Sequence, residues 1–257
     1  HFSWHSPFFL ITGVGLVAGI FMMAKLEPVT AHLQKEGPKQ NPFAKLATTA
    51  ANSRYIAGFM ATLVLSIGGF MLMPFGSTFV VQNLLVPLKK LPTIYMVTGL
   101  SSMFFGPLLG RVSDSFGKYR TFLFGSVFSI VILLYYTGLK EASLSMIIGL
   151  NILIFVGISA RMVSSSALSS ALPGPADRGA FMSISSSLQQ IAGGLASWAA
   201  GNIVHQANPD APLEHYDRLG WVVAGAMTLS VVFMYRVHRL VSEKGPGGPP
   251  VASGASH

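Results

Sequence analysis

Long apolar stretches recur along the whole chain, and polar residues are concentrated in the segments between them. Most of these stretches are close to the ~17–25 residues that a helix needs to cross a ~30 Å hydrocarbon layer. Lipid offers the backbone no hydrogen-bond partners, and long apolar runs lack the alternation of a membrane β-barrel, so we expect helices. Seven spans are predicted, at residues 8–24, 55–81, 94–109, 119–137, 142–159, 181–204 and 219–237.

The longest polar stretch between spans, residues 25–54, separates the first span from the other six. Its prolines and glycines interrupt helix formation, so we interpret it as a linker. Pro42 and the apolar residues after it predict a short helix at the membrane surface, with Lys45 directed toward lipid headgroups. Residues 241–257 are rich in Gly, Pro and Ser, and we expect them to be disordered.

The composition agrees with a membrane protein, because 51% of the residues are hydrophobic and only 10% are charged, against roughly 25% charged residues in soluble domains. The net charge of +8 does not indicate a nucleic-acid binder, since the cations are spread over loops rather than gathered on one soluble face. One alternate set of loops holds most of them, whereas the other set holds only Lys89, Lys90, Lys140 and Arg218. By the positive-inside rule, the chain begins outside and ends in the cytoplasm.

The chain contains no cysteine, which excludes disulfides, thiolate metal sites and a cysteine nucleophile. Its first residue is His1 rather than methionine. An odd number of spans that starts outside would require an unusual insertion route. We therefore interpret the chain as a fragment whose upstream part is missing.

A glycine-containing basic segment, residues 110–120, joins the third and fourth predicted spans. Glycines permit a tight turn there, and Asp114 is placed to cap the following helix. The segment resembles the loop signature of the major facilitator superfamily: Gly, any residue, Leu, small, Asp, Arg, any, Gly, basic, any, basic. The matching residues are Gly110, Asp114, Gly117, Lys118 and Arg120, with Val112 in place of Leu and Ser115 in place of the first Arg. An ordinary basic loop is the alternative.

A second resemblance covers residues 173–200, which are similar to the penultimate helix of bacterial sugar-efflux and drug-efflux-like facilitators. Together the two resemblances imply an all-α integral membrane protein, with a six-helix C-terminal bundle of a major-facilitator fold preceded by one extra transmembrane helix. They imply two three-helix repeats within the bundle. The implied domains are 1–24, the last helix of an N-terminal half; 25–54, a cytoplasmic linker; 55–240, the bundle; and 241–257, a cytoplasmic tail.

The resemblance also implies a secondary active transporter of the alternating-access type in the bacterial inner membrane, which moves a small solute outward by proton antiport. The implied partners are the solute, the lipid bilayer, protons and the N-terminal half of the same transporter. No enzymatic activity, cofactor, metal or nucleic acid is expected. No Asp, Glu, Lys or Arg lies in the middle of a predicted span, so we expect a proton carrier in the N-terminal half.

Polar side chains on one face of the sixth predicted span are the strongest candidates for lining a solute cavity. They recur at i, i+3, i+4 and i+7 and therefore share a helix face. These residues are Ser183, Ser186, Ser187 and Gln190. Polar groups inside a membrane are costly, so the face should meet water or protein, and hydrogen bonds between helices are the alternative. Ser66 and Asn151 are two further candidates.

The facilitator signature implies a conformational latch. In that family the motif aspartate helps to hold the outward-facing state by contacting a helix N-terminus and an arginine. Here we expect Asp114 to pair with Arg161, placed at the cytoplasmic end of the fifth predicted span, with Arg178 as the second choice.

Two other classes of protein share some of these features. A seven-helix receptor or retinal protein has the same orientation, but residues 219–237 contain no lysine for a Schiff base. A membrane metalloenzyme would need paired histidines on a helix, whereas the histidines here lie in loops or at span ends. Other polytopic membrane proteins that do not transport solutes stay open as an alternative.

Overall fold

The structure is a computed structural model, and it describes residues 5–25 and 41–243. The chain divides into two compact units, His1–Asn41 and Pro42–His257. Half of the predicted linker, residues 26–40, and nearly all of the predicted disordered tail lie outside the described residues, so the structure does not test the expectations for these segments.

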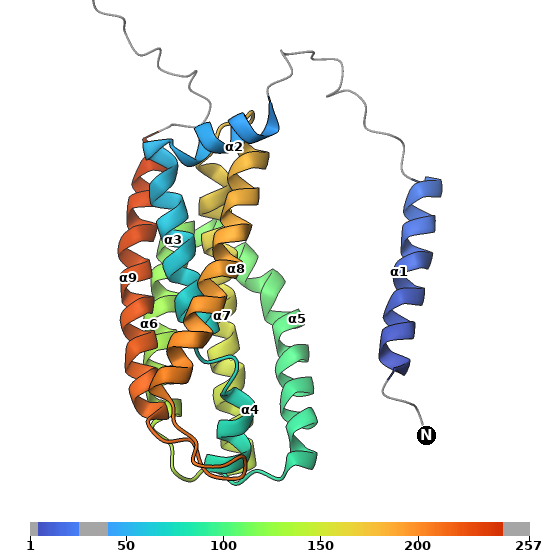
Figure 1. The fold of residues 1–257 in the computed structure, drawn as a ribbon, viewed down its shortest axis with the longest axis vertical. Coiled ribbons are helices and arrows are strands. Elements are labelled where there is room, and N and C mark those ends of the chain that lie inside the picture. Colours follow the sequence, from blue (N-terminus) through green and yellow to red (C-terminus); the bar gives the residue numbers. More distant parts are fainter. Residues whose placement is uncertain (1–4, 26–40, 244–257) are drawn as a thin grey trace, which may run out of the picture. The chain divides into compact units, whose positions relative to one another are not determined.

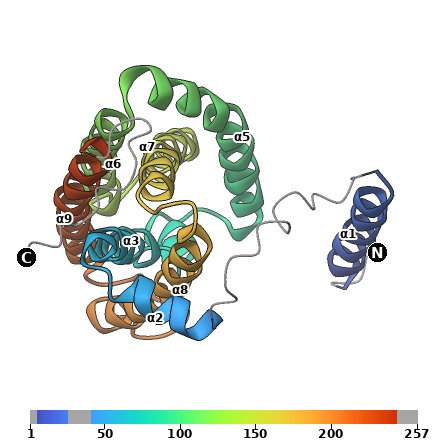
Figure 2. The same cartoon turned by 90° about the horizontal axis from the view of Figure 1, so that it is seen from above.

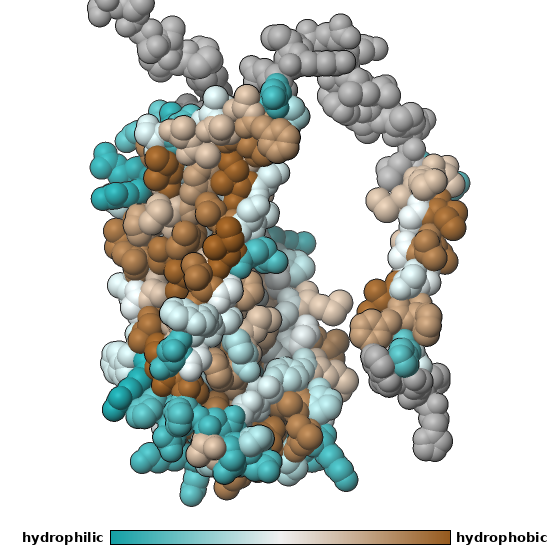
Figure 3. All heavy atoms as spheres, viewed as in Figure 1, coloured by the Kyte–Doolittle hydropathy of each residue, from teal (hydrophilic) through white to brown (hydrophobic). Residues whose placement is uncertain are grey.

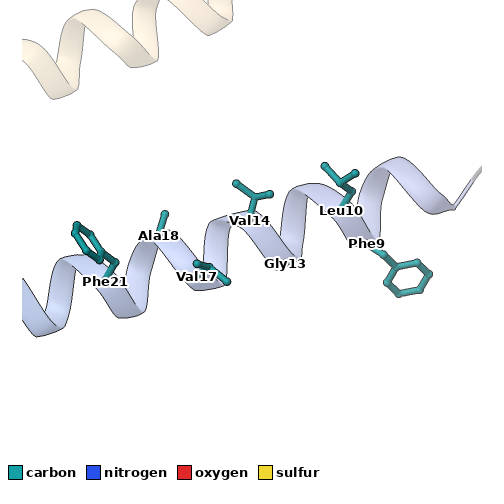
Figure 4. Close-up of a pocket in the computed structure, with 7 residues that line it drawn as sticks. All are labelled: Phe9, Leu10, Gly13, Val14, Val17, Ala18 and Phe21. Carbon is teal, nitrogen blue, oxygen red and sulfur yellow. The ribbon is translucent and has the colours of Figure 1, made fainter.

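The described residues of the first unit form one helix, α1 (Ser6–Lys25), which is apolar on every side. Figure 4 shows seven of its residues, and the side chains of Phe9, Leu10 and Val17 project from the helix in different directions. A helix that is hydrophobic all round is typical of a membrane span. α1 therefore confirms the first predicted span.

The second unit is a helical bundle (Figures 1 and 2). It begins with the predicted short helix, α2 (Pro42–Ala50). The long helices of the bundle are α3 (Ser53–Phe70), α5 (Leu91–Phe116), α6 (Lys118–Thr137), α7 (Leu144–Ala171), α8 (Arg178–Ile203) and α9 (Tyr216–Ser242). Between α3 and α5 lie the single turn α4 (Gly76–Thr78), a π-helical turn (Phe79–Asn83) and a 3-10 turn (Leu88–Lys90).

The long helices pack in an order that repeats itself within the bundle. α3 packs against α8 and α9, α7 packs against α5 and α6, and α6 packs against α9. Exchanging α3, α5 and α6 with α7, α8 and α9 maps this set of pairs onto itself. Two related three-helix repeats would produce this arrangement.

Six described helices are long and apolar enough to cross a membrane, judged by length and composition. They are α1, α3, α5, α6, α7 and α9. α8 is equally long but is not among the six, because serine and glutamine replace apolar residues on one of its faces. Figure 3 shows hydrophobic residues over the middle of the bundle and many hydrophilic residues toward its lower end. The expected all-α membrane fold is confirmed.

Two predicted spans end more than ten residues away from the ends of their helices in the structure. The span predicted at 55–81 is interrupted after Phe70, because paired glycines precede this point and Pro74 cannot donate a backbone hydrogen bond. The span predicted to end at residue 159 continues to Ala171, since the residues after Arg161 are apolar or small and the next proline is Pro173. The prediction ended this span too early because it stopped before the first charge.

Glycines bring α6 and α7 unusually close together. A Cβ atom added to Gly125 would lie 2.9 Å from the Cβ atom of Ala160, and one added to Gly157 would collide with the Ser129 hydroxyl. By contrast, a Cβ atom on Gly149, also in α7, would meet nothing within 4 Å. The α6–α7 interface therefore depends on two particular glycines.

Candidate functional site

The predicted polar face of α8 is open in the structure. Ser183, Ser186, Ser187 and Gln190 are all exposed. The Ser187 hydroxyl donates to the Ser183 carbonyl at 3.1 Å, within the same helix. None of the four side chains makes a hydrogen bond to another helix among the described residues, so interhelical bonding does not explain this face.

The opposite face of α8 packs against α3. The ring of Phe181 stacks on that of Phe59 with 4.9 Å between centroids. Farther along α8, Gly193 lies seven residues after Ser186 and borders the polar face, and a Cβ atom on it would lie 3.3 Å from the ring of Phe70. This apolar contact fixes the rotation of α8 about its own axis, and the rotation leaves the serines and Gln190 facing outward.

The structure separates the two further cavity candidates, Asn151 and Ser66. The Ser66 side chain is 4% exposed, and its hydroxyl donates to the Thr62 carbonyl at 2.8 Å. Ser66 is therefore enclosed within the bundle and does not join the open face of α8. Asn151 is half-buried and donates to the Ile147 carbonyl at 2.9 Å.

Asn151 belongs to an accessible face of α7. Phe155, Met162 and Ser166 follow it at spacings of four, seven and four residues, which places all four on one side of the helix. Phe155, Met162 and Ser166 are exposed. Most buried residues of α7, among them Gly157, Ala160 and Arg161, point away from this side of the helix.

The facilitator-like loop forms a one-residue junction between α5 and α6. Gly117 adopts φ +96°, a conformation that favours glycine, and it both ends α5 and precedes α6. The expectation of a tight glycine turn is confirmed. Asp114 lies in the last turn of α5 and does not cap α6, because Gly117 occupies the cap position and makes no side-chain cap bond. Gly110 lies within α5, and Lys118 and Arg120 lie in the first turn of α6.

Arg161 is not at the end of its helix, and it does not pair with Asp114. It lies ten residues before the end of α7 and is 3% exposed. Its Nε donates to the Ser126 hydroxyl at 3.1 Å and its Nη2 to the Ser230 hydroxyl at 2.9 Å. The expectation that no charge lies inside a span is therefore wrong. Asp114 itself is exposed, and its carboxylate forms no hydrogen bond or ion pair with another described residue.

Arg178, the second expected partner of Asp114, instead bonds within the α7–α8 turn. Its guanidinium donates to the Ser170 carbonyl through Nη2 at 3.0 Å and Nε at 3.3 Å. The contact links the start of α8 to the last turn of α7.

The carboxylate that forms contacts at this end of the bundle is Asp177, which sequence reasoning missed. It accepts a hydrogen bond from the Tyr55 hydroxyl at 2.8 Å and forms an ion pair with Lys45. The Tyr55 hydroxyl in turn accepts from the Gly174 amide at 3.3 Å. Lys45 was expected to face lipid headgroups, but the ion pair instead ties α2 to the start of α8.

A second set of contacts links two segments at the opposite end of the bundle. The Asn83 side chain donates to the Leu213 carbonyl and accepts from the Leu213 amide, both at 2.8 Å. Nearby, the ring of Phe79 stacks on Tyr216 with 4.1 Å between centroids. The π-helical turn is thus joined to the α8–α9 loop, and such turns occur frequently at functional sites.

Metal chemistry finds no support in the described part of the chain, where no group of three or more His, Asp or Glu side chains could hold an ion.

Among curated proteins, none matches this chain. The family model of the Major Facilitator Superfamily matches residues 1–197 and 58–253. These two ranges together span nearly the whole sequence, and the all-helical bundle and the glycine junction agree with the match. The chain belongs to the Major Facilitator Superfamily, a family of secondary transporters that carry small-molecule solutes across lipid bilayers.

Proposed function

We propose that this chain supplies the six-helix C-terminal half of a bacterial inner-membrane transporter of the sugar-efflux or drug-efflux type, with α1 as the last helix of the N-terminal half. The transporter exports a small solute by alternating access, driven by proton antiport. The solute passes between the two halves, along the open faces of α7 and α8.

The open polar face of α8 is the observation that carries this proposal. Four polar side chains there have no partner from another helix among the described residues, whereas the opposite face of α8 is packed against α3. In a membrane bundle such a face needs water or polar protein, because hydrocarbon cannot satisfy it. A water-filled cavity between two related halves meets that need.

The distribution of cations supports the proposed orientation. The α2 end of the bundle carries the exposed cations Arg111, Arg120, Arg178, Arg236 and Arg239. The opposite end carries Lys89, Lys90, Lys140 and Arg218. By the positive-inside rule, this distribution supports a cytoplasmic location for the α2 end and the C-terminus.

The carboxylates of the described part support an N-terminal location for the proton carrier. Asp114, Asp177 and Asp217 lie at helix ends, and the others lie in loops or just beyond α9. A proton carrier must titrate inside the membrane, so it belongs to the other half. Asp114 keeps the proposed role of gate, with a partner on that half.

Gln190→Leu tests the proposal, with Ile191→Leu, also at an exposed α8 position, as the matched control. Full-length protein is reconstituted into vesicles that contain a pH-sensitive dye, and sugars, cationic drugs and organic anions are added in turn. A solute-dependent proton flux is expected in the wild type and in the control, with at least a ~10-fold lower rate in Gln190→Leu. Equal rates in all three proteins would reduce Gln190 to a surface residue.

A further inference from the structure

Arg161 is a charge in the interior of the bundle with neutral neighbours. Ser126 and Ser230, its two hydrogen-bond partners, are fully buried on α6 and α9. The guanidinium carbon also lies 5.6 Å from the centroid of the Phe122 ring. Three helices therefore enclose this one side chain.

The two serines are oriented to surround a cation. The Ser126 hydroxyl donates its proton to the Phe122 carbonyl at 2.8 Å, and the Ser230 hydroxyl donates its proton to the Met227 carbonyl at 2.6 Å. Each serine thus presents only lone pairs to Arg161. Hydroxyl dipoles of this kind solvate a guanidinium but do not cancel its charge, and a guanidinium stays protonated under physiological conditions.

No carboxylate compensates this charge among the described residues. The ion pairs there join Lys45 to Asp177 and Arg239 to Glu243, both near the α2 end of the bundle. Since Arg161 is enclosed by α6, α7 and α9, a carboxylate from another half of the transporter does not reach it. The middle of the bundle therefore carries a fixed net positive charge.

From this we infer that Arg161 makes the potential along the solute path positive and selects an organic anion as the transported solute. The inference rests on the proposed transport along the open faces of α7 and α8. Arg161 does not touch the solute, because its side chain lies on the buried side of α7. It acts through its electric field across the helix.

The size of this effect follows from the geometry of α7. A solute on the open face lies roughly one helix diameter from the guanidinium, about 12 Å. At that distance one unit charge changes the occupancy of an anion relative to a cation by roughly threefold if the effective dielectric is that of water, and by roughly 100-fold at an effective dielectric of ~20.

Charged thiol reagents measure this potential without knowledge of the solute. Ser166, exposed on the open face of α7, is replaced in the full-length protein by Ser166→Cys; this chain contributes no native cysteine as background. Modification rates are compared for the anionic 2-sulfonatoethyl and the cationic 2-trimethylammonioethyl methanethiosulfonates, each normalised to a free thiol. Asn202→Cys, at the far end of α8, serves as the distant control.

We expect the anion-to-cation rate ratio at Ser166→Cys to exceed that of the free thiol. It should fall at least ~3-fold in Arg161→Gln and stay unchanged in Arg161→Lys, which keeps the charge. Ser230→Asp places a carboxylate beside Arg161 and should lower the ratio equally, which keeps the test valid if Arg161→Gln fails to fold. The ratio at Asn202→Cys should change little.

The failure of this inference is distinguishable from the failure of the proposed function. Ser166→Cys could react with an anion-to-cation rate ratio that favours the cation or that is the same with and without Arg161→Gln and Ser230→Asp. Either result would overturn the inference that anions are selected but would leave the proposed function standing. Absence of reaction with either reagent, at Ser166→Cys and at Gln190→Cys, would show that no aqueous path follows these faces and would overturn both proposals.

Discussion

Gly157→Ala should destabilise the bundle, whereas Gly149→Ala in the same helix should not. The added methyl group at position 157 collides with the Ser129 hydroxyl and comes within 3.2 Å of a Phe128 ring carbon, but at position 149 it meets nothing within 4 Å. Overpacking of this kind costs about 1–3 kcal/mol. Both changes gain the same helix propensity, about 0.5–1 kcal/mol, which cancels in the comparison. The free energy of unfolding should therefore differ by about 1–3 kcal/mol between the two variants.

Ser129→Ala provides the second arm of a double-mutant cycle. The Ser129 hydroxyl is buried and has no hydrogen-bond partner, so its removal leaves no donor or acceptor unpaired. In the double variant the collision with the hydroxyl is relieved, and the coupling energy should be at least about 1 kcal/mol. Unfolding free energies are measured in detergent micelles by steric trapping. If Gly157→Ala proves as stable as Gly149→Ala, the close contact between α6 and α7 does not require glycine at position 157.

Three further predictions concern the two ends of the bundle. Asp177→Asn should weaken the ion pair with Lys45 and the hydrogen bond from Tyr55, at a cost of about 1–3 kcal/mol. Hydrogen exchange in α2, Pro42–Ala50, should therefore accelerate. Unchanged exchange there would show that other contacts hold α2. Asn83→Ala should leave both backbone groups of Leu213 without their partner and speed proteolysis of residues 204–215, and an unaltered cleavage rate would contradict this tie. Asp114→Asn should shift the full-length protein toward its inward-facing state, as read from distance measurements. Its free energy of unfolding should stay within ~0.5 kcal/mol of the wild-type value. An unchanged ratio of inward-facing to outward-facing protein would contradict the proposed role of Asp114 as a gate.

The helical architecture could be predicted because it depends on local properties of the chain. Apolar length alone indicates α1, α3, α5, α6, α7 and α9, and Pro42 marks the start of α2 in both the sequence and the structure. Gly117 is a similar case, since a positive φ at a tight turn is a property of one residue. The open face of α8 also follows from spacing, because Ser183, Ser186 and Gln190 share a side of any helix that contains them.

The partners of the charged residues could not be predicted, because they depend on how distant segments pack. Tyr55 and Asp177 lie 122 residues apart in the chain and meet only when α3 packs against α8. Arg161 appeared to mark the end of a span because the cost of a buried charge seemed decisive. That cost is offset by hydroxyls from α6 and α9, whose positions no local pattern reveals. The rotation of α3 similarly decided that Ser66 faces inward.

The single-residue junction at Gly117 has a mechanical consequence. α5 contains 26 residues and is about 39 Å long at a rise of 1.5 Å per residue. With one residue connecting it to α6, α5 can tilt about Gly117, and Pro107 inside the helix permits a bend near the same end. A tilt of about 10° around Gly117 moves the far end of α5 by roughly 7 Å, about one and a third helical turns. In the proposed transporter, a small movement at the Gly117 end of α5 therefore opens or closes the proposed solute path near the other end of the helix.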